Sequence, residues 1–300
     1  MKRITEGAFA KLDLTLDVLD RRADGYHDIK SIMQTVSLHD DVLVDLGGEG
    51  WQVHCYRELL PPDADENTTP ELVTCGLPQD RDNLAWKAAE AFYARTGLPR
   101  EGLEIFISKR IPMQAGLGGG SADAGAMIRA LHAICGIAEP LDKIAAASTC
   151  VGEEVPYCVM NQCARVEGIG EKVRPLPDHC AFHVLLVKPP CGIETGKAYQ
   201  MLDLDKAWHP DIDLVERCLL ADEYETLCGA LGNTLEYSAF QMEPQIRAIR
   251  AMLTADGADA ALMSGSGSAV FALSRDLALL QRLQPKYEAL GLKTWLTGRC

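Results

Sequence analysis

Residues 112–127 read PMQAGLGGGSADAGAM, a stretch of five glycines and a serine that leads into an alanine-rich run. Glycine loses more backbone entropy on folding than any other residue, so such a stretch needs a structural or functional reason. The alternation in GLEIFISKRIP predicts a strand before it. Ala124, Ile128 and Leu131 fall at helical spacing and predict a helix after it, ending at Gly136. The fold must therefore place a glycine-rich turn between a strand and a helix.

Three structures would account for this turn: a helix cap, a tight packing turn, or a loop whose N–H groups bind an anion. The common phosphate loops do not fit, because no lysine follows the glycines and a GxGxxG count from Gly116 puts Ser121 at the last glycine. Free N–H groups and the helix dipole still favour an anion here, and the Ser121 hydroxyl would cap the helix or bind Mg²⁺. A cap needs one such residue, so phosphate binding is the favoured interpretation.

The rest of the chain predicts a mixture of strands and helices without internal repeats. Strands are predicted over 11–19, 40–46, 102–112, 181–190, 260–273 and 293–298, and helices over 83–96, 124–135, 211–255 and 277–290. Asp82 or Asn83 is the expected cap of the first helix, and Asp24–Gly25 is an expected turn. Residues 57–80 are polar and contain prolines, which predicts a surface excursion. A change of composition near residues 172–180 divides the chain into predicted domains 1–172 and 173–300.

The charge of the chain argues against nucleic acid as a partner. Its 43 acidic and 29 basic residues give a net charge of −14, and no block of more than two consecutive Lys/Arg residues occurs. A groove that tracks phosphates along a nucleic acid needs such basic clusters. A nucleotide can still bind, because local N–H dipoles and a few lysines outweigh a screened surface charge.

The cysteines and the N-terminal segment favour a cytoplasmic protein. Eleven cysteines are scattered without any CxxC, which fits neither a zinc site nor a disulfide scaffold. Cys135 and Cys158 lie among apolar neighbours and are expected to be buried in a reducing compartment. No apolar signal region and no run of about 18 apolar residues is found, so neither export nor a membrane span is expected.

Four stretches together resemble the GHMP small-molecule kinases. PMQAGLGGGSADA is similar to their P-x-x-x-G-L-G-G-G-S-[SA]-[DN]-A motif. AFAKLDLTLDVLDRRADGYH resembles the A-P-A-K-[IL]-N-L and R-x-D-G-Y-H elements of the 4-diphosphocytidyl-2-C-methyl-D-erythritol kinases. GEEVP with GIGE, and NTLE with MSGSGS, are similar to the same family's G-A-D-V-P, G-x-G-E, N-D-L-E and M-S-G-S-G-[ST] segments. The match runs in order from about residue 8 to residue 273.

The resemblance implies an α+β, two-domain GHMP kinase fold. Left-handed-type β-α-β elements are expected in the N-terminal domain, a ferredoxin-like α/β sandwich in the C-terminal domain, and the active site in the interdomain cleft. It implies an ATP- and Mg²⁺-dependent kinase of non-mevalonate isoprenoid synthesis that phosphorylates the 2-hydroxyl of a cytidine-diphosphate-linked erythritol. The implied partner is this small molecule, with no nucleic acid and no membrane, and the protein is expected to be a monomer or homodimer.

The matched positions name the site residues that the resemblance implies. Lys11, Glu154 and Asp13 would be catalytic, and Ser121 would bind Mg²⁺. Tyr26, His27, Thr195 and Tyr199 would hold the cytidine end of the substrate. ATP would be bound by Asn83, Leu84, Lys109, Pro112, Gly116, Leu117, Gly118, Gly119, Gly120, Ser121, Ser264, Gly265, Ser266 and Gly267. Alone, Lys11 would be an ordinary surface lysine and SGSGS a hairpin turn; their ordered occurrence favours function.

The chain departs from the family pattern near the expected chemistry. Glu154 replaces the aspartate of G-A-D-V-P, Asp13 replaces an asparagine, Phe9 replaces a proline, and Glu194 stands where serine or threonine is usual. Either Asp13 accepts the proton with Glu154 auxiliary, or Glu154 is the base, with Lys11 stabilising the reacting oxygen in both cases. A second hypothesis is a GHMP kinase for a different alcohol. A third is a pseudokinase that retains only nucleotide binding.

Overall fold

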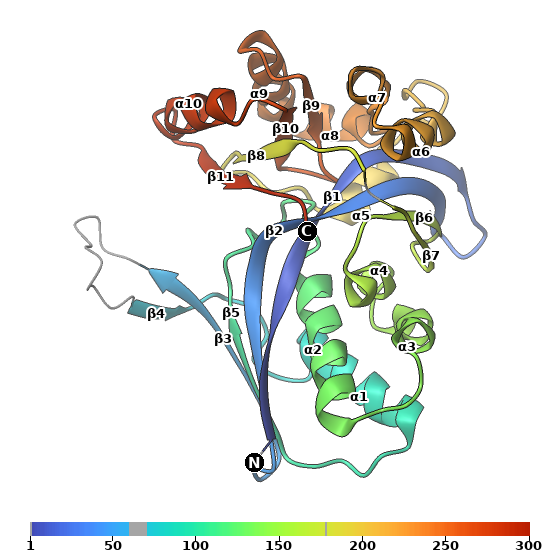
Figure 1. The fold of residues 1–300 in the computed structure, drawn as a ribbon, viewed down its shortest axis with the longest axis vertical. Coiled ribbons are helices and arrows are strands. Elements are labelled where there is room, and N and C mark those ends of the chain that lie inside the picture. The colour runs from blue at the N-terminus through green and yellow to red at the C-terminus, as the bar shows by residue number, and fades with distance from the viewer. Residues whose placement is uncertain (1, 60–70, 178) are drawn as a thin grey trace. The chain divides into compact units, whose positions relative to one another are not determined.

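The computed structural model describes residues 2–59, 71–177 and 179–300 (Figure 1). The chain forms two compact units. The first unit contains Met1–Ala10, His39–Pro112 and Gly118–Asn161, and the second contains Lys11–Leu38, Met113–Leu117 and Gln162–Cys300. Because these units interleave along the sequence, they do not correspond to a cut at one residue, and the boundary at 172/173 stays a prediction.

Two long strands, β1 (Lys2–Arg21) and β2 (His27–Leu46), pair with each other and contribute to both units. The turn between them contains Asp24 and Gly25, as predicted, and Gly25 has a positive φ of 93°. In the middle of β1 both faces are covered, because the apolar Leu12 and Leu14 and the polar Lys11 and Asp13 are all at most 2% exposed. Polar side chains held inside in this way require partners.

The first unit combines strands with a group of helices. Its strand order is β4-β3-β5-β2, from β3 (Trp51–Leu59), β4 (Glu71–Thr74) and β5 (Leu103–Ser108), with β3 and β5 parallel. Helix α2 (Gly119–Cys135) packs against α1 (Leu84–Thr96) and α4 (Val155–Met160), and α3 (Leu141–Ala147) packs against α4 (Figure 1). The 3-10 turn η1 (Ser148–Cys150) connects α3 to α4.

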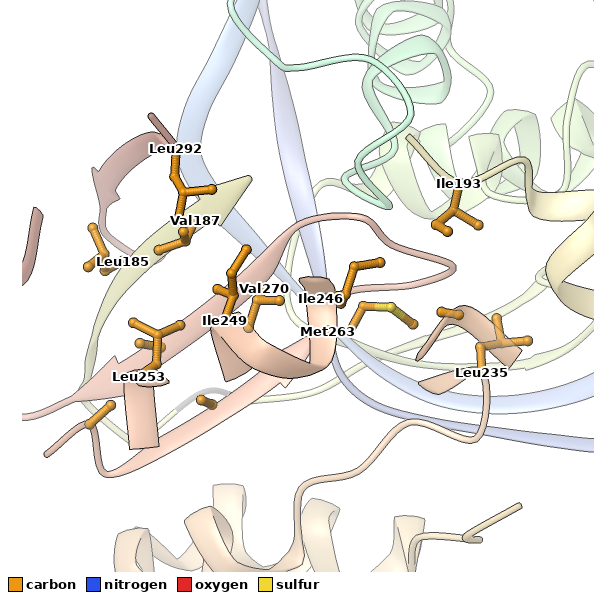
Figure 2. Packing of buried hydrophobic residues seen from close by; sticks show 14 of the residues in the cluster. Leu185, Val187, Ile193, Leu235, Ile246, Ile249, Leu253, Met263, Val270 and Leu292 are labelled. Atoms are coloured by element: carbon orange, nitrogen blue, oxygen red, sulfur yellow. The ribbon is translucent and has the colours of Figure 1, made fainter. Parts of the chain in front are cut away.

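The second unit contains a four-stranded antiparallel sheet of order β11-β8-β10-β9, and the strands β6 and β7, which continue from β2. Helices α9 and α10 cover one face of the four-stranded sheet, where leucines, isoleucines and valines form one apolar cluster (Figure 2). The strands are β6 (Ala164–Gly168), β7 (Lys172–Pro175), β8 (His183–Lys188), β9 (Ala260–Met263), β10 (Val270–Ser274) and β11 (Lys293–Thr297). The helices are α5 (Thr195–Gln200), α6 (Ile212–Ala221), α7 (Tyr224–Ala230), α8 (Glu236–Met242), α9 (Pro244–Ala255) and α10 (Leu277–Glu288).

The predicted elements are largely confirmed. Asn83 caps α1 by accepting a hydrogen bond from the Ala85 N–H at 2.9 Å, and Gly97 and Gly136 end α1 and α2 in the left-handed conformation. In the predicted surface excursion 57–80, residues 71–80 are exposed or half-buried as expected, but the segment also carries an antiparallel pairing of β3 with β4, which was not predicted; residues 60–70 lie outside the described residues. Short elements without clear periodicity, such as α3, α4 and β7, were not predicted. Cys158 is buried as expected, whereas Cys135 is only half-buried.

Candidate active site

The N-terminus of α2 is formed by glycines and lacks a side-chain cap. Helix α2 begins at Gly119, and its cap residue Gly118 has a left-handed φ of 69°. Ser121 lies inside the first turn, so the alternative in which Ser121 caps the helix is wrong. The first N–H groups of a helix have no partner within it. Those of α2 carry the positive end of a 17-residue helix dipole with no acidic side chain in the first turn.

Gly116 belongs to the second unit and has a different purpose. A Cβ at this position would lie 2.0 Å from the carbonyl oxygen of Ser264, and the φ of Gly116 is 72°. Only glycine permits both the approach and the dihedral angle. The packing-turn interpretation is therefore correct for Gly116, while the uncapped helix start supports an anion at Gly118, Gly119 and Gly120.

Lys11 and Asp13 form a buried ion pair on β1. Lys11 Nζ lies 2.5 Å from Asp13 Oδ2, and the two side chains are 2% and 1% exposed. The Ser31 hydroxyl donates to Asp13 Oδ1 at 2.9 Å, so both carboxylate oxygens have a donor. The spacing of two residues on one strand puts both side chains on the same face. The charge that distinguishes Asp13 from the family asparagine is thus neutralised locally by Lys11.

The loop Ser264–Gly267 lies beside this pair. A Cβ on Gly265 would be 3.1 Å from Lys11 Nζ and 3.2 Å from Asp13 Oδ2. The Ser264 hydroxyl donates to the Gly116 carbonyl at 3.0 Å and accepts from the Asp13 N–H at 3.3 Å. The second unit therefore brings together Lys11, Asp13, Gly116 and this loop, which the sequence had predicted as functional residues far apart in the chain.

The predicted cytidine-binding residues also lie in the second unit. The rings of His27 and Tyr199 are 5.1 Å apart with an interplanar angle of 31°, and Tyr26 is exposed. Burial, with a contribution from the charge of Arg21, lowers the pKa of His27, so its ring is neutral at pH 7. Thr195 at the start of α5 forms a 2.8 Å hydroxyl–hydroxyl hydrogen bond with Ser266. These contacts link the aromatic pair and the glycine loop through α5.

In the first unit, Lys109 is held between two buried carboxylates. Its Nζ lies 2.5 Å from Asp40 Oδ2 and 2.6 Å from Asp123 Oδ2. Burial and the proximity of Asp40 outweigh the effect of Lys109 and raise the pKa of Asp123 to about 8. Asp40 also accepts the N–H groups of Arg110 and Ile111, which fixes the chain just before the glycine stretch.

Other residues predicted to bind ATP lie in different parts of the first unit. Leu84 opens α1, and its Cδ1 would be 3.2 Å from a Cβ on Gly120, so α1 and the start of α2 are close. Pro112 immediately follows the segment held by Asp40 and ends the first unit's middle segment. Lys109 itself is 3% exposed and its ammonium is occupied by carboxylates, which favours a structural role for it.

The remaining departures from the family pattern have distinct environments. Glu154 lies at the N-terminal cap position of α4 in the first unit. Glu194 pairs with Lys197 at 2.6 Å, and these two side chains are 62% and 61% exposed. Phe9 packs against His39 with ring centroids 5.0 Å apart and the ring planes tilted by 38°. Glu194 therefore adds no uncompensated charge.

Sequence reasoning did not name Asp40 or Ser31, and it matched the NTLE segment to the family without assigning a role to Asn233 or Glu236. All four support the site residues, or the segments beside them, by hydrogen bonds or ion pairs. Asp40 and Ser31 lie on strand β2. A carboxylate or a hydroxyl within an apolar strand is the sequence signal that could have identified them as buried polar residues. Their partners lie elsewhere in the chain, so the pairing itself follows from the fold alone.

Comparison with known sequences then decides the family. The profile of the GHMP kinases N terminal domain matches residues 83–168, and that of the GHMP kinases C terminal domain matches residues 215–291. A 4-diphosphocytidyl-2-C-methyl-D-erythritol kinase of Bacillus pumilus is 36% identical over 284 residues, covering 94% of this chain and 91% of that protein. The chain belongs to the GHMP kinase family. This confirms the expected ATP-dependent kinase with an alcohol acceptor.

Further similarities place this GHMP kinase among the same group of enzymes. A Geobacillus protein of the same name is 35% identical over 283 residues, covering 94% of this chain and 91% of the relative. The crystal structure of a 4-(cytidine 5'-diphospho)-2C-methyl-D-erythritol kinase matches with a TM-score of 0.75 at 28% identity, with 99% of each chain covered. Homoserine kinase from Cytophaga hutchinsonii, at 17% identity and a TM-score of 0.74, shares the fold over 99% of this chain and 95% of its own.

The predicted α+β GHMP kinase fold is confirmed by these matches. Among the described residues, no helix of this GHMP kinase has the length and apolar character needed to cross a membrane.

Proposed function

We propose that this GHMP kinase transfers the γ-phosphoryl group of ATP to the 2-hydroxyl of 4-diphosphocytidyl-2-C-methyl-D-erythritol, releasing ADP and a proton. The buried Lys11–Asp13 pair beside the Gly265 backbone carries the proposal. Its cation and carboxylate lie together, so one would stabilise the oxygen of an acceptor alcohol while the other removes its proton. The names of the relatives supply the acceptor.

Phosphoryl transfer depends on positioning and on neutralising charge, more than on a strong base. In the first unit, the N–H groups of Gly119 and Gly120 at the start of α2 would hold phosphate oxygens. In the second unit, the Ser264–Gly267 backbone would hold phosphate oxygens beside Lys11. Asn83 and Leu84 at the start of α1 would line the adenosine pocket.

Lys11 and Asp13 would act on the acceptor hydroxyl together. The Lys11 ammonium would stabilise negative charge on the attacking oxygen, and Asp13 would accept its proton. Asp13 already contacts Lys11 directly, so we assign it the role of base and assign Glu154 an auxiliary role. Neutral His27 and Tyr199 would stack on the cytosine ring, with Tyr26 and Thr195 beside them.

The residues present fit a Mg²⁺ ion that arrives with ATP. No cluster of three metal-ligating His, Cys, Asp or Glu side chains occurs in the described part of the chain, which does not fit an all-protein cage. Ser121 offers a hydroxyl oxygen in the first turn of α2, whereas Asp123 is turned to another side of the helix and is bound to Lys109. Ser121 would hold the ion together with phosphate and water oxygens, and the ion would supply charge neutralisation.

The alternative of a different alcohol acceptor loses support from two of its three acidic departures. Asp13 is neutralised by Lys11, and Glu194 by an exposed pair with Lys197. A changed charge on the substrate is therefore not needed to explain either residue.

The test is release of ADP, coupled to a spectroscopic signal, with the cytidine-diphosphate alcohol and with ATP alone as the control. Turnover that depends on the alcohol supports the proposal. ATP binding without transfer would contradict it and favour the pseudokinase. Asp13→Asn is expected to lower kcat by about 10²–10⁴, the usual contribution of a general base, and Glu154→Gln by less. Parent-like rates for both variants would refute the assignment of either carboxylate.

A further inference from the structure

Asn233 joins strand β1 to the loop Ser264–Gly267. The Leu16 N–H donates to the Gly232 carbonyl at 2.8 Å, and the Thr234 N–H donates to the Leu16 carbonyl at 2.9 Å. Residues 232–234 thus form a short parallel bridge to β1, the strand that carries Lys11 and Asp13. The backbone on both sides of Asn233 is therefore hydrogen-bonded directly to the strand that carries Lys11 and Asp13.

The side chain of Asn233 uses all of its polar groups on its neighbours. Its Nδ2 donates to the Met263 carbonyl at 2.9 Å and to the Gly265 carbonyl at 2.7 Å, and its Oδ1 accepts from the Leu235 N–H at 2.9 Å. Asn233 is only 3% exposed, so water does not compete for these bonds. Only an amide offers two N–H donors and an acceptor with this size.

A second side chain from the same segment holds the same loop. Glu236 accepts from the Met263 N–H at 3.0 Å and from Arg250 at 2.6 Å. Leu235 and Met263, both labelled in Figure 2, belong to one apolar cluster that fixes the surrounding elements. Met263, the residue before the loop, is therefore held by Glu236 through its N–H and by Asn233 through its carbonyl.

The bond to Gly265 has a consequence for the next amide. In a trans peptide the N–H points away from the carbonyl, so holding the Gly265 carbonyl on Asn233 turns the Ser266 N–H to the opposite side. Within the described residues, no hydrogen bond uses this Ser266 N–H, although Ser266 is 8% exposed. An N–H that no protein group accepts in a largely buried residue is available to donate to a ligand atom. The adjacent Gly265 lies beside the Lys11–Asp13 pair, with Lys11 Nζ 3.1 Å and Asp13 Oδ2 3.2 Å from the position of a Cβ, so the peptide faces the groups that the proposed reaction uses.

We propose that Asn233 is a positioning residue that orients the peptide between Gly265 and Ser266, so that the Ser266 N–H donates to a phosphate oxygen of ATP. This inference rests on the proposed function for the identity of the alcohol alone. Asn233 does not touch either substrate, and its effect reaches ATP through the loop.

Asn233→Asp is the sharpest test, because a carboxylate of the same size cannot donate to the two carbonyls. It is expected to lower kcat/KM for ATP about a hundredfold, the effect of misplacing a group by about 1 Å. The dissociation constant of ADP, measured by calorimetry without the alcohol, should rise. KM for the alcohol should stay within about twofold, because the Asn233 contacts end at the loop.

The pH dependence separates positioning from general destabilisation. The charged and titratable groups on elements around Asn233 include Lys11, Asp13 and Asp17 on β1, His209 paired with Asp17, Glu236 on α8 and Arg250 on α9. Lowering the pH from about 8 to about 6 protonates the introduced carboxyl group, whose pKa burial raises, and restores one donor. The ratio of variant to parent kcat/KM should therefore rise as the pH falls, since the parent groups titrate in both proteins.

Thr234→Val is the matched control. Thr234 is equally buried and its hydroxyl donates to the Leu16 carbonyl at 3.2 Å, but it makes no bond to the loop. It should lower the melting temperature and leave kcat/KM for ATP within about threefold. Equal losses in both variants at matched stability would overturn the proposal.

A pH-independent ratio of variant to parent, or an unchanged ADP dissociation constant, would also overturn it. If Asn233→Asp does not fold, Asn233→Ala gives the same ADP comparison without a new charge. If the parent does not turn over the cytidine-diphosphate alcohol, the proposed function fails, and the ADP measurement still decides the role of Asn233.

Discussion

The Lys11–Asp13 pair can be tested by a double-mutant cycle on stability. At 2.5 Å and an effective dielectric constant of about 20, the Coulomb attraction is about 7 kcal/mol, opposed by the loss of hydration of both ions. Lys11→Met leaves the Asp13 carboxylate buried with the Ser31 hydroxyl as its donor. Removing one partner of a buried pair costs about 3–5 kcal/mol.

The double variant Lys11→Met/Asp13→Asn removes both charges and should cost less than the sum of the single variants by at least about 2 kcal/mol, because no ion is left buried. Urea unfolding followed by circular dichroism measures the four free energies of unfolding. The pair Glu194–Lys197 is the control, since its 2.6 Å distance is similar but its side chains are 62% and 61% exposed. Its coupling should be at most about 1 kcal/mol. Equal coupling in the two cycles would refute the argument from burial.

Two further predictions concern Gly116 and Glu236. Gly116→Ala should destabilise the protein by more than about 1 kcal/mol, because its Cβ would meet the Ser264 carbonyl at 2.0 Å and its φ is 72°; Gly196→Ala, where nothing lies within 4 Å, should not lower the melting temperature. Burial raises the pKa of Glu236 from 4.5 to about 7, so the protonated form favours the folded state and stability from this group is lost as pH rises through that window. Glu236→Gln should reduce the fall in melting temperature between pH 4.5 and about 7. An unchanged dependence of the melting temperature on pH would contradict the burial argument.

The sequence predicted the elements whose signals are local. The cap Asn83, the stop Gly97 and the helix after the glycine stretch follow from short patterns, and the structure places them where expected. The Lys11–Asp13 contact is also local, because alternate residues of a strand share a face. These features depend on neighbours within a few residues, which a sequence displays directly.

Contacts between distant segments could not be derived in this way. Asp40 pairs with Lys109, and Asn233 binds the carbonyls of Met263 and Gly265, only because the fold brings those segments together. The backbone carbonyls carry no sequence signal at all, so a motif identifies Asn233 without saying what it binds. The role of a buried polar residue therefore has to be read from its partners.

Glycines are required in this one stretch for two different physical reasons. Gly116 is required by the close approach of Ser264, which needs no ligand, whereas the glycines at the start of α2 leave N–H groups without a cap. The first requirement predicts a loss of stability on substitution of Gly116. The second predicts that substitution of Gly119 or Gly120, where a Cβ would meet only side chains at 3.1 and 3.2 Å, lowers ATP affinity with a smaller loss of stability. Because the two effects separate experimentally, the packing turn and the anion site are not competing explanations: they apply to different glycines of the same stretch.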